Sequence, residues 1–200
     1  MNTQLTNHTS HKNSIIETER LLLRPFQEGD KTDLYEYLQN PEVHCFVDMK
    51  IDSLEQAKKE VAERAKDNAL YLAIVLKETG KVIGEIFSHA EGTDPTSKVL
   101  DTFSPCWMLN SVYKGNGYGY EAAHAYIDCL FLEHGARRIY IYTEDYNIAC
   151  QKLCEKLGTR QEGLFKEFVS FLNDENGNPI YENTYQYAIL KKEWLEKWGK

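Results

Sequence analysis

Hydrophobic and polar positions follow two different periods along this chain, which predicts a mixture of strands and helices. An apolar run over residues 15–26 closes at an Arg-Pro pair, and this favours a strand. Helical spacing follows over residues 31–39, with Asp30 as the expected N-cap. A second amphipathic helix is expected to begin at Asp52 or Ser53, because its apolar residues fall on one face and its charges on the other.

Strand-like patterns dominate the chain after residue 70. Two strands flank Glu78-Thr79-Gly80, which is typical of a hairpin turn. Gly135 and Gly158 each follow a helical segment, where glycine commonly ends a helix. The other expected elements are, in chain order, a strand over 99–110, a helix over 117–134, a strand over 136–144, a helix over 147–157, strands over 163–172 and 180–190, and a helix over 191–198.

No linker or internal repeat divides this succession of elements. We therefore predict one α/β domain over residues 15–200, of the α+β type, with helices flanking a mixed, mostly antiparallel central sheet. Residues 1–14 are polar, which is typical of a flexible tail. The chain starts without the apolar core of a signal peptide, and its apolar runs are too short to span a membrane. A cytoplasmic protein without a membrane partner is expected.

Charge narrows the possible partners. The net charge of -8 argues against nucleic acid, because phosphate binding needs a basic face. It is compatible with a cationic substrate such as an amine, and equally with charge that serves only solubility. The 42% hydrophobic and 27% charged composition is that of an ordinary soluble globular protein, which leaves the enzyme and binding-module classes open.

The cysteines argue against a disulfide framework and against a zinc site. Their number, five, is odd, no CxxC pair occurs, and the pattern fits a reducing compartment. Cys150 and Cys154 have helical i,i+4 spacing, but no His or Cys cluster accompanies them, so packing explains them better than metal binding. We expect no metal. The five positions are Cys45, Cys106, Cys129, Cys150 and Cys154.

The segment YKGNGYGYEAAHAY, residues 113–126, places a cluster of glycines directly before a helix. A strand, a glycine loop and a helix start make an anion site, because the first turn of a helix has unpaired N–H groups and a positive dipole end. The P-loop motif is absent, and Tyr120 occupies the third glycine position of the dinucleotide fingerprint. The remaining interpretations are a pyrophosphate loop of the form [Q/R]xxGx[G/A], from Lys114 to Gly119, and a simple tight turn.

Four stretches occur along the chain in the order ETERLLLRPF, CWMLNSVYKGNGYGYEA, NIACQKLCEKLGTRQEG and ENTYQYAILKKEW. In this order they resemble the GNAT N-acetyltransferase family, and in particular its ribosomal-protein N-terminal acetyltransferase branch, over about residues 15–195. This resemblance implies the GNAT fold and acetyl-CoA as co-substrate. It also implies direct transfer of the acetyl group to a primary amine in a ternary complex. The acceptor would be a protein N-terminus or a small amine. The runner-up interpretation is a coenzyme A-binding module with weak or lost catalysis. The protein would be a monomer or a homodimer.

The resemblance also implies which residues hold the cofactor. Backbone amides of the glycine loop would bind the pyrophosphate, and the strand before it would bind the pantetheine arm. Lys114 departs from the family's Gln or Arg, and Asn147, which resembles a cofactor-contacting asparagine, has a second interpretation as a helix N-cap. The implied set is Met108, Leu109, Asn110, Lys114, Gly115, Asn116, Gly117, Tyr118, Gly119, Tyr120 and Asn147.

The catalytic residues are less clearly indicated. The Leu109 amide would stabilise the oxyanion. The family's acid tyrosine is replaced by Cys154, and the branch's acid serine by Cys150, which is therefore either the acid or a buried small residue. Glu85 and Glu167 are candidate bases, although Glu167 is off register with the family motif.

Two tyrosines near the end of the chain are the last candidates for the site. Tyr185 and Tyr187 alternate along a predicted strand, so they share one face. They would either line the acceptor cleft or pack in the interior.

Overall fold

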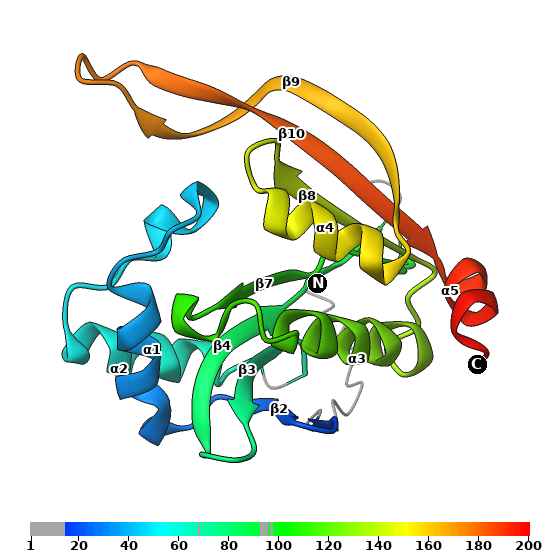
Figure 1. The fold of residues 1–200 in the computed structure, drawn as a ribbon, viewed down its shortest axis with the longest axis horizontal. Coiled ribbons are helices and arrows are strands. Elements are labelled where there is room, and N and C mark those ends of the chain that lie inside the picture. Colours follow the sequence, from blue (N-terminus) through cyan, green and yellow to red (C-terminus); the bar gives the residue numbers. More distant parts are fainter. Residues whose placement is uncertain (1–14, 68, 93–95, 97) are drawn as a thin grey trace, which may run out of the picture.

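The computed structural model describes residues 15–67, 69–92, 96 and 98–200. The predicted tail, residues 1–14, lies outside the described residues. Figure 1 shows two sheets stacked along the molecule, with helices around the lower one and against the upper one. The fold class predicted from sequence, mixed and mostly antiparallel, is confirmed.

The first sheet is antiparallel throughout and has the order β1-β2-β3-β4-β7. The predicted hairpin at Glu78-Thr79-Gly80 is present and connects β3 to β4. The predicted first strand is divided into two short strands that pair with each other. The strand bounds are β1 Ile16–Glu17, β2 Leu21–Pro25, β3 Tyr71–Leu76, β4 Lys81–Phe87 and β7 Cys106–Leu109.

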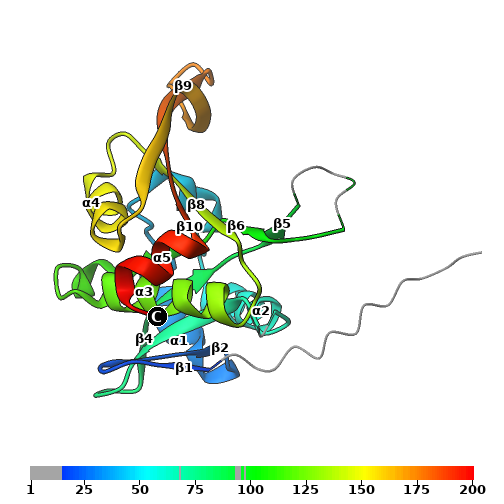
Figure 2. The same ribbon diagram turned by 90° about the vertical axis from the view of Figure 1, so that its right-hand side faces the viewer.

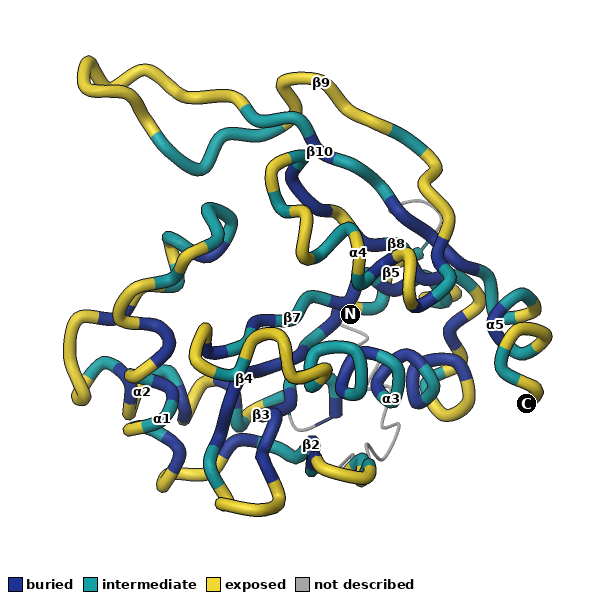
Figure 3. Tube along the Cα trace, in the orientation of Figure 1, coloured by how far each residue is buried: buried dark blue, intermediate teal, exposed yellow. Residues whose placement is uncertain are grey.

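The second sheet has the order β5-β6-β8-β10-β9. Its β6–β8 pair is parallel, and its other pairs are antiparallel. The strands β9 and β10 form a long hairpin that rises beyond the rest of the molecule (Figure 2), and its far end is largely exposed (Figure 3). The bounds are β5 Ala90–Glu91, β6 Thr102–Phe103, β8 Arg138–Glu144, β9 Arg160–Asn173 and β10 Pro179–Leu190.

Helices cover both faces of the first sheet, which explains why β3 reads as a nearly continuous apolar run. Its residues alternate between two cores, because successive side chains of a strand point to opposite faces. Ala73 and Val75 pack with α1 and α2, while Leu72, Ile74 and Leu76 pack with α3 and the second sheet. The bounds are α1 Lys31–Leu38, α2 Leu54–Arg64, α3 Tyr118–Leu132, α4 Ile148–Leu157 and α5 Lys191–Trp198.

The ends of two helices test the capping predictions. Ser53 caps α2 by accepting a hydrogen bond from the Gln56 amide at 3.2 Å, so the helix begins at the second of the two predicted positions. Asp30 is the N-cap of α1, as predicted, but its side chain makes no capping hydrogen bond to that helix. Asp30 belongs to a 3-10 turn, η1 Glu28–Asp30, and its carboxylate accepts two hydrogen bonds from the Arg24 guanidinium, at 2.7 and 2.8 Å. A charged guanidinium that donates two hydrogen bonds binds a carboxylate more strongly than a helix amide does.

The chain passes from the second sheet to the first between β6 and β7. Phe103 pairs with Ile139 of β8 in the second sheet, whereas Cys106 pairs with Phe87 of β4 in the first. Beyond that point β7 is the edge of its sheet, and β8 continues in the other. Toward Leu109 and Glu144 the two strands are therefore not paired with each other, and we call the region between their carboxyl ends the gap.

Candidate functional site

The backbone of β7 presents unpaired groups to the gap between the two sheets. The Asn110 amide donates to the Ile83 carbonyl at 2.9 Å, on the β4 side. In an antiparallel ladder, alternate residues point their N–H and C=O groups to opposite sides. The Leu109 N–H and C=O therefore face the gap, where β7 has no neighbouring strand among the described residues. In the part of the chain that the structure describes, these two groups are therefore free of strand pairing on that side of the sheet.

The glycine loop leads from the end of β7 into α3. A short 3-10 turn, η3 Ser111–Tyr113, comes first, and Gly117 is the N-cap of the helix. Gly115 and Gly117 have φ values of +82° and +83°, which L side chains rarely adopt. A Cβ at Gly119 would lie 3.2 Å from the Leu109 side chain, so this glycine allows β7 and α3 to approach closely. The first-turn amides of α3 are thereby placed beside the gap.

Three cationic side chains surround this loop. Arg20 donates to the Asn116 carbonyl at 3.0 Å, pairs with Glu121, and lies 4.5 Å from the centre of the Tyr118 ring. Lys156 of α4 lies 4.1 Å from the centre of the Tyr120 ring. Lys114 forms an ion pair with Glu42. The sequence indicated Lys114 alone, because Arg20 and Lys156 are remote from the loop in sequence and no motif marks them.

Three other residues that were predicted to bind the cofactor make contacts within the fold. Met108 points its backbone toward β4, and its side chain packs with α1 and α2. Asn110 is buried, donates to Glu36 at 2.9 Å and accepts from the Val112 amide at 3.1 Å, so its side chain supports the loop. The Asn147 side chain accepts from the Cys150 amide at 3.2 Å, which is the N-cap that the sequence left open.

Glu85 is fully buried and surrounded by donors. Its carboxylate accepts from the Tyr37 hydroxyl at 3.0 Å, from Arg64 Nε at 2.9 Å and from the Tyr71 hydroxyl at 3.1 Å. Burial raises the pKa of both tyrosine hydroxyls, which keeps them protonated as donors. A substrate amine has no access to this carboxylate in the structure, so its arrangement is that of a structural ion pair.

The other candidate acid and base lie apart from each other. Cys150 is partly buried in the first turn of α4, beside the end of β8. A hydrogen bond from the Cys154 thiol lowers the pKa of Cys150, against the effect of burial. Glu167 is exposed on a bulge of β9, with φ +47°, and its amide donates to Asn183. The structure brings Cys150, but not Glu167, toward the gap.

The two predicted acceptor tyrosines share one face of β10, and their ring centres are 6.2 Å apart. That face points into the interior. Tyr187 is 3% exposed within the main core, and Tyr185 packs at its edge. The structure therefore places Tyr187 in the core and not in a cleft.

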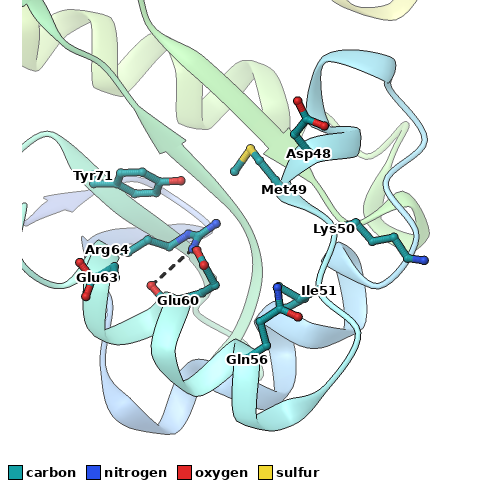
Figure 4. Close-up of a pocket in the computed structure, with 9 residues that line it drawn as sticks. All are labelled: Asp48, Met49, Lys50, Ile51, Gln56, Glu60, Glu63, Arg64 and Tyr71. Carbon is teal, nitrogen blue, oxygen red and sulfur yellow. Dashed lines mark hydrogen bonds and ion pairs between the residues drawn. The ribbon is translucent and has the colours of Figure 1, made fainter. Parts of the chain in front are cut away.

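A pocket of about 330 Å³ opens on the α2 side of the first sheet (Figure 4). Tyr71 and Arg64, two of the partners of Glu85, line it, so the buried carboxylate lies behind its wall. Acidic side chains predominate over basic ones in the lining. The lining residues are Asp48, Met49, Lys50, Ile51, Gln56, Glu60, Glu63, Arg64 and Tyr71.

One wall of this pocket belongs to a 3-10 helix that the sequence did not predict, η2 His44–Met49. It lies against β9, below the hairpin in Figure 1. A polar cluster formed by His44, Cys45, Glu144, Tyr146 and Glu182 connects η2 with the ends of β8 and β10. Sequence reasoning missed this cluster, because its members come from three separate segments of the chain and only the fold brings them together.

Within the part of the chain that the structure describes, no helix is long and apolar enough to cross a membrane. The same residues contain no group of three or more His, Cys, Asp or Glu side chains arranged to hold a metal ion.

Comparison with known proteins agrees with this geometry. The family profile described as "Acetyltransferase (GNAT) domain" matches residues 20–160. The uncharacterised N-acetyltransferase YnaD of Bacillus subtilis is 31% identical over 90% of this chain and 98% of its own. A crystal structure of a GNAT-family acetyltransferase from Bacillus anthracis superposes with a TM-score of 0.75 at 27% identity, covering 90% of this chain and all of the other.

A more distant likeness concerns the fold alone. The ribosomal-protein-S5-alanine acetyltransferase from Vibrio fischeri has a TM-score of 0.68 at 21% identity, covering 90% of this chain and 98% of that one.

Proposed function

Because this chain belongs to the GNAT acetyltransferase family and is an N-acetyltransferase, we propose that it transfers an acetyl group from acetyl-CoA directly to a primary amine within a ternary complex. One observation carries the proposal. The unpaired Leu109 N–H and C=O face the gap between β7 and β8, directly before a loop whose glycines lead into α3. A thioester bound there would have a phosphate site and an oxyanion donor on one continuous stretch of backbone.

The residues of the loop fit a pyrophosphate. A Cβ built at Gly115 meets nothing within 4 Å, so the backbone there is open to a ligand. The first-turn N–H groups of α3 and the positive end of its dipole would hold the phosphates. Arg20, Lys114 and Lys156 would add cationic charge, and Lys114 would exchange Glu42 for phosphate. Asn147 would remain the cap of α4 and contact the cofactor from that position.

Acetyl-CoA supplies the acetyl group as an activated thioester. The Leu109 N–H donates to the carbonyl oxygen as negative charge develops on it. We assign proton donation to the departing sulfur to Cys150, because its thiol lies in the first turn of α4 and its pKa is lowered by the Cys154 thiol. Holding both substrates in one site supplies much of the acceleration, since the reaction becomes effectively intramolecular.

The acceptor would enter from the side of α2 and η2. The pocket there is acidic, with Asp48, Glu60 and Glu63 in its lining. An amine that arrives as a cation would be attracted by this charge. Both acceptor classes fit the description, since a protein N-terminus and a small polyamine each carry a primary or α-amino group that is protonated near neutral pH.

Calorimetric titration with acetyl-CoA, followed by thiol release with a panel of amines, tests the proposal. The panel consists of spermidine, kanamycin and the tripeptide Ala-Arg-Tyr amide. Binding with turnover of one amine is the expected result, and the responding amine identifies the acceptor class. Binding without turnover of any amine would favour a coenzyme A-binding module, and no binding would remove the proposed function altogether.

A further inference from the structure

His44 and Glu182 form a histidine–carboxylate pair at the open end of the gap. His44 Nδ1 lies 2.5 Å from Glu182 Oε1, although the two residues are 138 positions apart in sequence. The Glu182 side chain is 9% exposed and the His44 side chain 37% exposed. The carboxylate is therefore on the inner side of the pair, and the imidazole retains an edge that solvent or a substrate can reach.

The His44 imidazole is held in one orientation. The Tyr146 hydroxyl accepts from the His44 backbone amide at 3.0 Å, and the two rings are 4.7 Å apart, centre to centre. With Glu182 ionised, Nδ1–H donates to Oε1. Nε2 then carries the free lone pair of the neutral imidazole. A carboxylate that fixes the tautomer of a base is a recurring device of enzymes that move protons.

The position of this pair follows from the segment that carries His44. Glu42 pairs with Lys114 of the glycine loop, and the Cys45 thiol hydrogen bonds to Glu144 at the end of β8. Two peptide units separate Glu42 from His44, so their Cα atoms are at most about 7 Å apart. His44 therefore lies between the proposed phosphate loop and the carboxyl end of β8, where an amine would meet the thioester.

The surroundings of the pair attract a cation. Glu182 Oε2 is buried and has no hydrogen-bond partner among the described residues. The other titratable groups that face the pair are Glu144 on β8, Tyr146 before α4, Cys45 on η2 and Cys150 on α4. Burial raises the pKa of the Cys45 thiol and of the Tyr146 hydroxyl, so both stay protonated near neutral pH and do not accept a proton. Burial also raises the pKa of Glu144, but this residue is only 6% exposed, so the imidazole of His44 is the more accessible proton acceptor.

We propose that His44 is the general base for the acceptor amine and that Glu182 is its positioning residue; this inference rests on the proposed function. Nε2 takes one proton from the ammonium group and passes it to solvent through the exposed edge of the ring. The neutral nitrogen forms the C–N bond, and the C–S bond breaks with its electron pair on sulfur. Cys150 donates its proton to that sulfur, and the second N–H proton of the amine restores the Cys150 thiol. Glu85, buried behind Tyr37 and Tyr71, has no part in this transfer.

The test compares His44→Gln and Glu182→Gln with wild type on the panel amine that the wild type acetylates fastest. We expect kcat to fall by about 100-fold or more in His44→Gln, the scale of general base catalysis, with unchanged affinity for acetyl-CoA. The pH profile should also change. Without a base, kcat/KM should climb with pH up to the ionisation of the amine itself, whereas the wild type should level off earlier. Glu182→Asp should recover part of the loss of Glu182→Gln.

A matched control exists in α3, where His124 pairs with Asp128 at 3.5 Å and packs against Trp194. His124→Gln should leave kcat and the pH profile unchanged. A second readout needs no turnover. In long-range ¹H–¹⁵N spectra, neutral wild-type His44 should carry its proton on Nδ1, and a proton on Nε2 would overturn the inference.

The outcomes separate the two levels of the proposal. Variants that match the wild-type rate and pH profile would remove the role of His44 and leave the acetyltransferase proposal intact. A wild type that binds no acetyl-CoA or acetylates no amine would remove the proposed function, and the role of His44 with it.

Discussion

Arg20 donates through Nη1 to the backbone carbonyl of Asn116 at 3.0 Å and connects the start of the first sheet to the glycine loop. The same guanidinium pairs with Glu121 in the first turn of α3, at 2.7 Å. One side chain thus fixes the loop and the helix start relative to each other. Because the loop contributes backbone groups to the proposed phosphate site, its shape is as important as its charge.

Replacing Arg20 with Gln is therefore expected to weaken acetyl-CoA binding by about tenfold, the effect of losing one charged contact. The stability of the fold should change by at most about 1 kcal/mol, because the pair is substantially exposed. Titration calorimetry and thermal unfolding measure the two effects. Arg137→Gln is the matched control, since Arg137 forms a similarly exposed pair with Asp101 at 2.8 Å, away from the loop. Equal affinities in the two variants would contradict the role given to Arg20.

The glycine loop can be tested with a pair of variants of equal backbone strain. Gly117 and Gly177 have φ values of +83° and +82°, but Gly177 lies in the turn of the β9–β10 hairpin. Aspartate at either position costs about 1 kcal/mol of folding free energy. Only Gly117→Asp also places a carboxylate where the pyrophosphate is proposed to bind, so we expect at least about 100-fold weaker acetyl-CoA binding. If Gly177→Asp loses as much affinity, strain and not charge explains the result.

Much of the fold could be predicted from the sequence, because its signals are local. Ser53 shows its capping role three residues from the amide that it binds, and Gly158 ends α4 with φ +84° as expected. The change of sheet between Phe103 and Cys106 has no such signal. The change of sheet depends on the strands that pair with β6 and with β7, which are β8 and β4. Both belong to other parts of the chain, so the local sequence does not indicate the change.

The parts of the candidate site also differ in how far the sequence could predict them. The glycine loop is contiguous, so its role in the proposed phosphate site was predictable from residues 113–119 alone. The His44–Glu182 pair joins residues 138 positions apart, on an element whose helical turn the sequence pattern did not show. Glu85 illustrates the converse error. A carboxylate in a central strand suggests a base, but its three donors are contributed by α1, α2 and β3, which only the tertiary structure reveals.

Glu85→Gln is accordingly expected to destabilise the protein and not to abolish the chemistry. Removing one partner of a buried ion pair costs about 3–5 kcal/mol. We expect the lower end, about 3 kcal/mol, because Arg64 keeps its second partner, Glu60, at 2.6 Å. For a chain of this size, that corresponds to a fall in Tm of about 6–12 °C. Urea unfolding gives the free energy, and kcat is measured well below the transition.

Tyr37→Phe is a milder control for Glu85→Gln, because it removes only one neutral hydrogen-bond donor to Glu85. It should lower the free energy of unfolding by about 1 kcal/mol. A Glu85→Gln variant with wild-type stability and a kcat lowered by about 100-fold would restore Glu85 as the base.

The stability of the protein should depend on pH through Glu144 and Glu162 in opposite directions. Burial raises the pKa of Glu144 in the folded state, so ionising it costs more in the folded than in the unfolded chain. That cost is absent below the unfolded pKa of about 4.3 and grows as pH rises through the folded value. Glu144→Gln should therefore match the wild type in acid and be more stable than the wild type at neutral pH.

For Glu162 the sign is reversed. A hydrogen bond from Arg138 lowers the pKa of Glu162, so its ionised form stabilises the folded state above the unfolded pKa, and this contribution is lost as pH falls through the folded value. Glu162→Gln should be less stable than the wild type at neutral pH and equal to it in strong acid. Thermal unfolding of the three proteins across this range gives two difference curves that diverge with rising pH. A Glu144→Gln curve that runs parallel to that of Glu162→Gln would show that the Glu144 carboxylate is stabilised by its neighbours in the polar cluster and not penalised by burial.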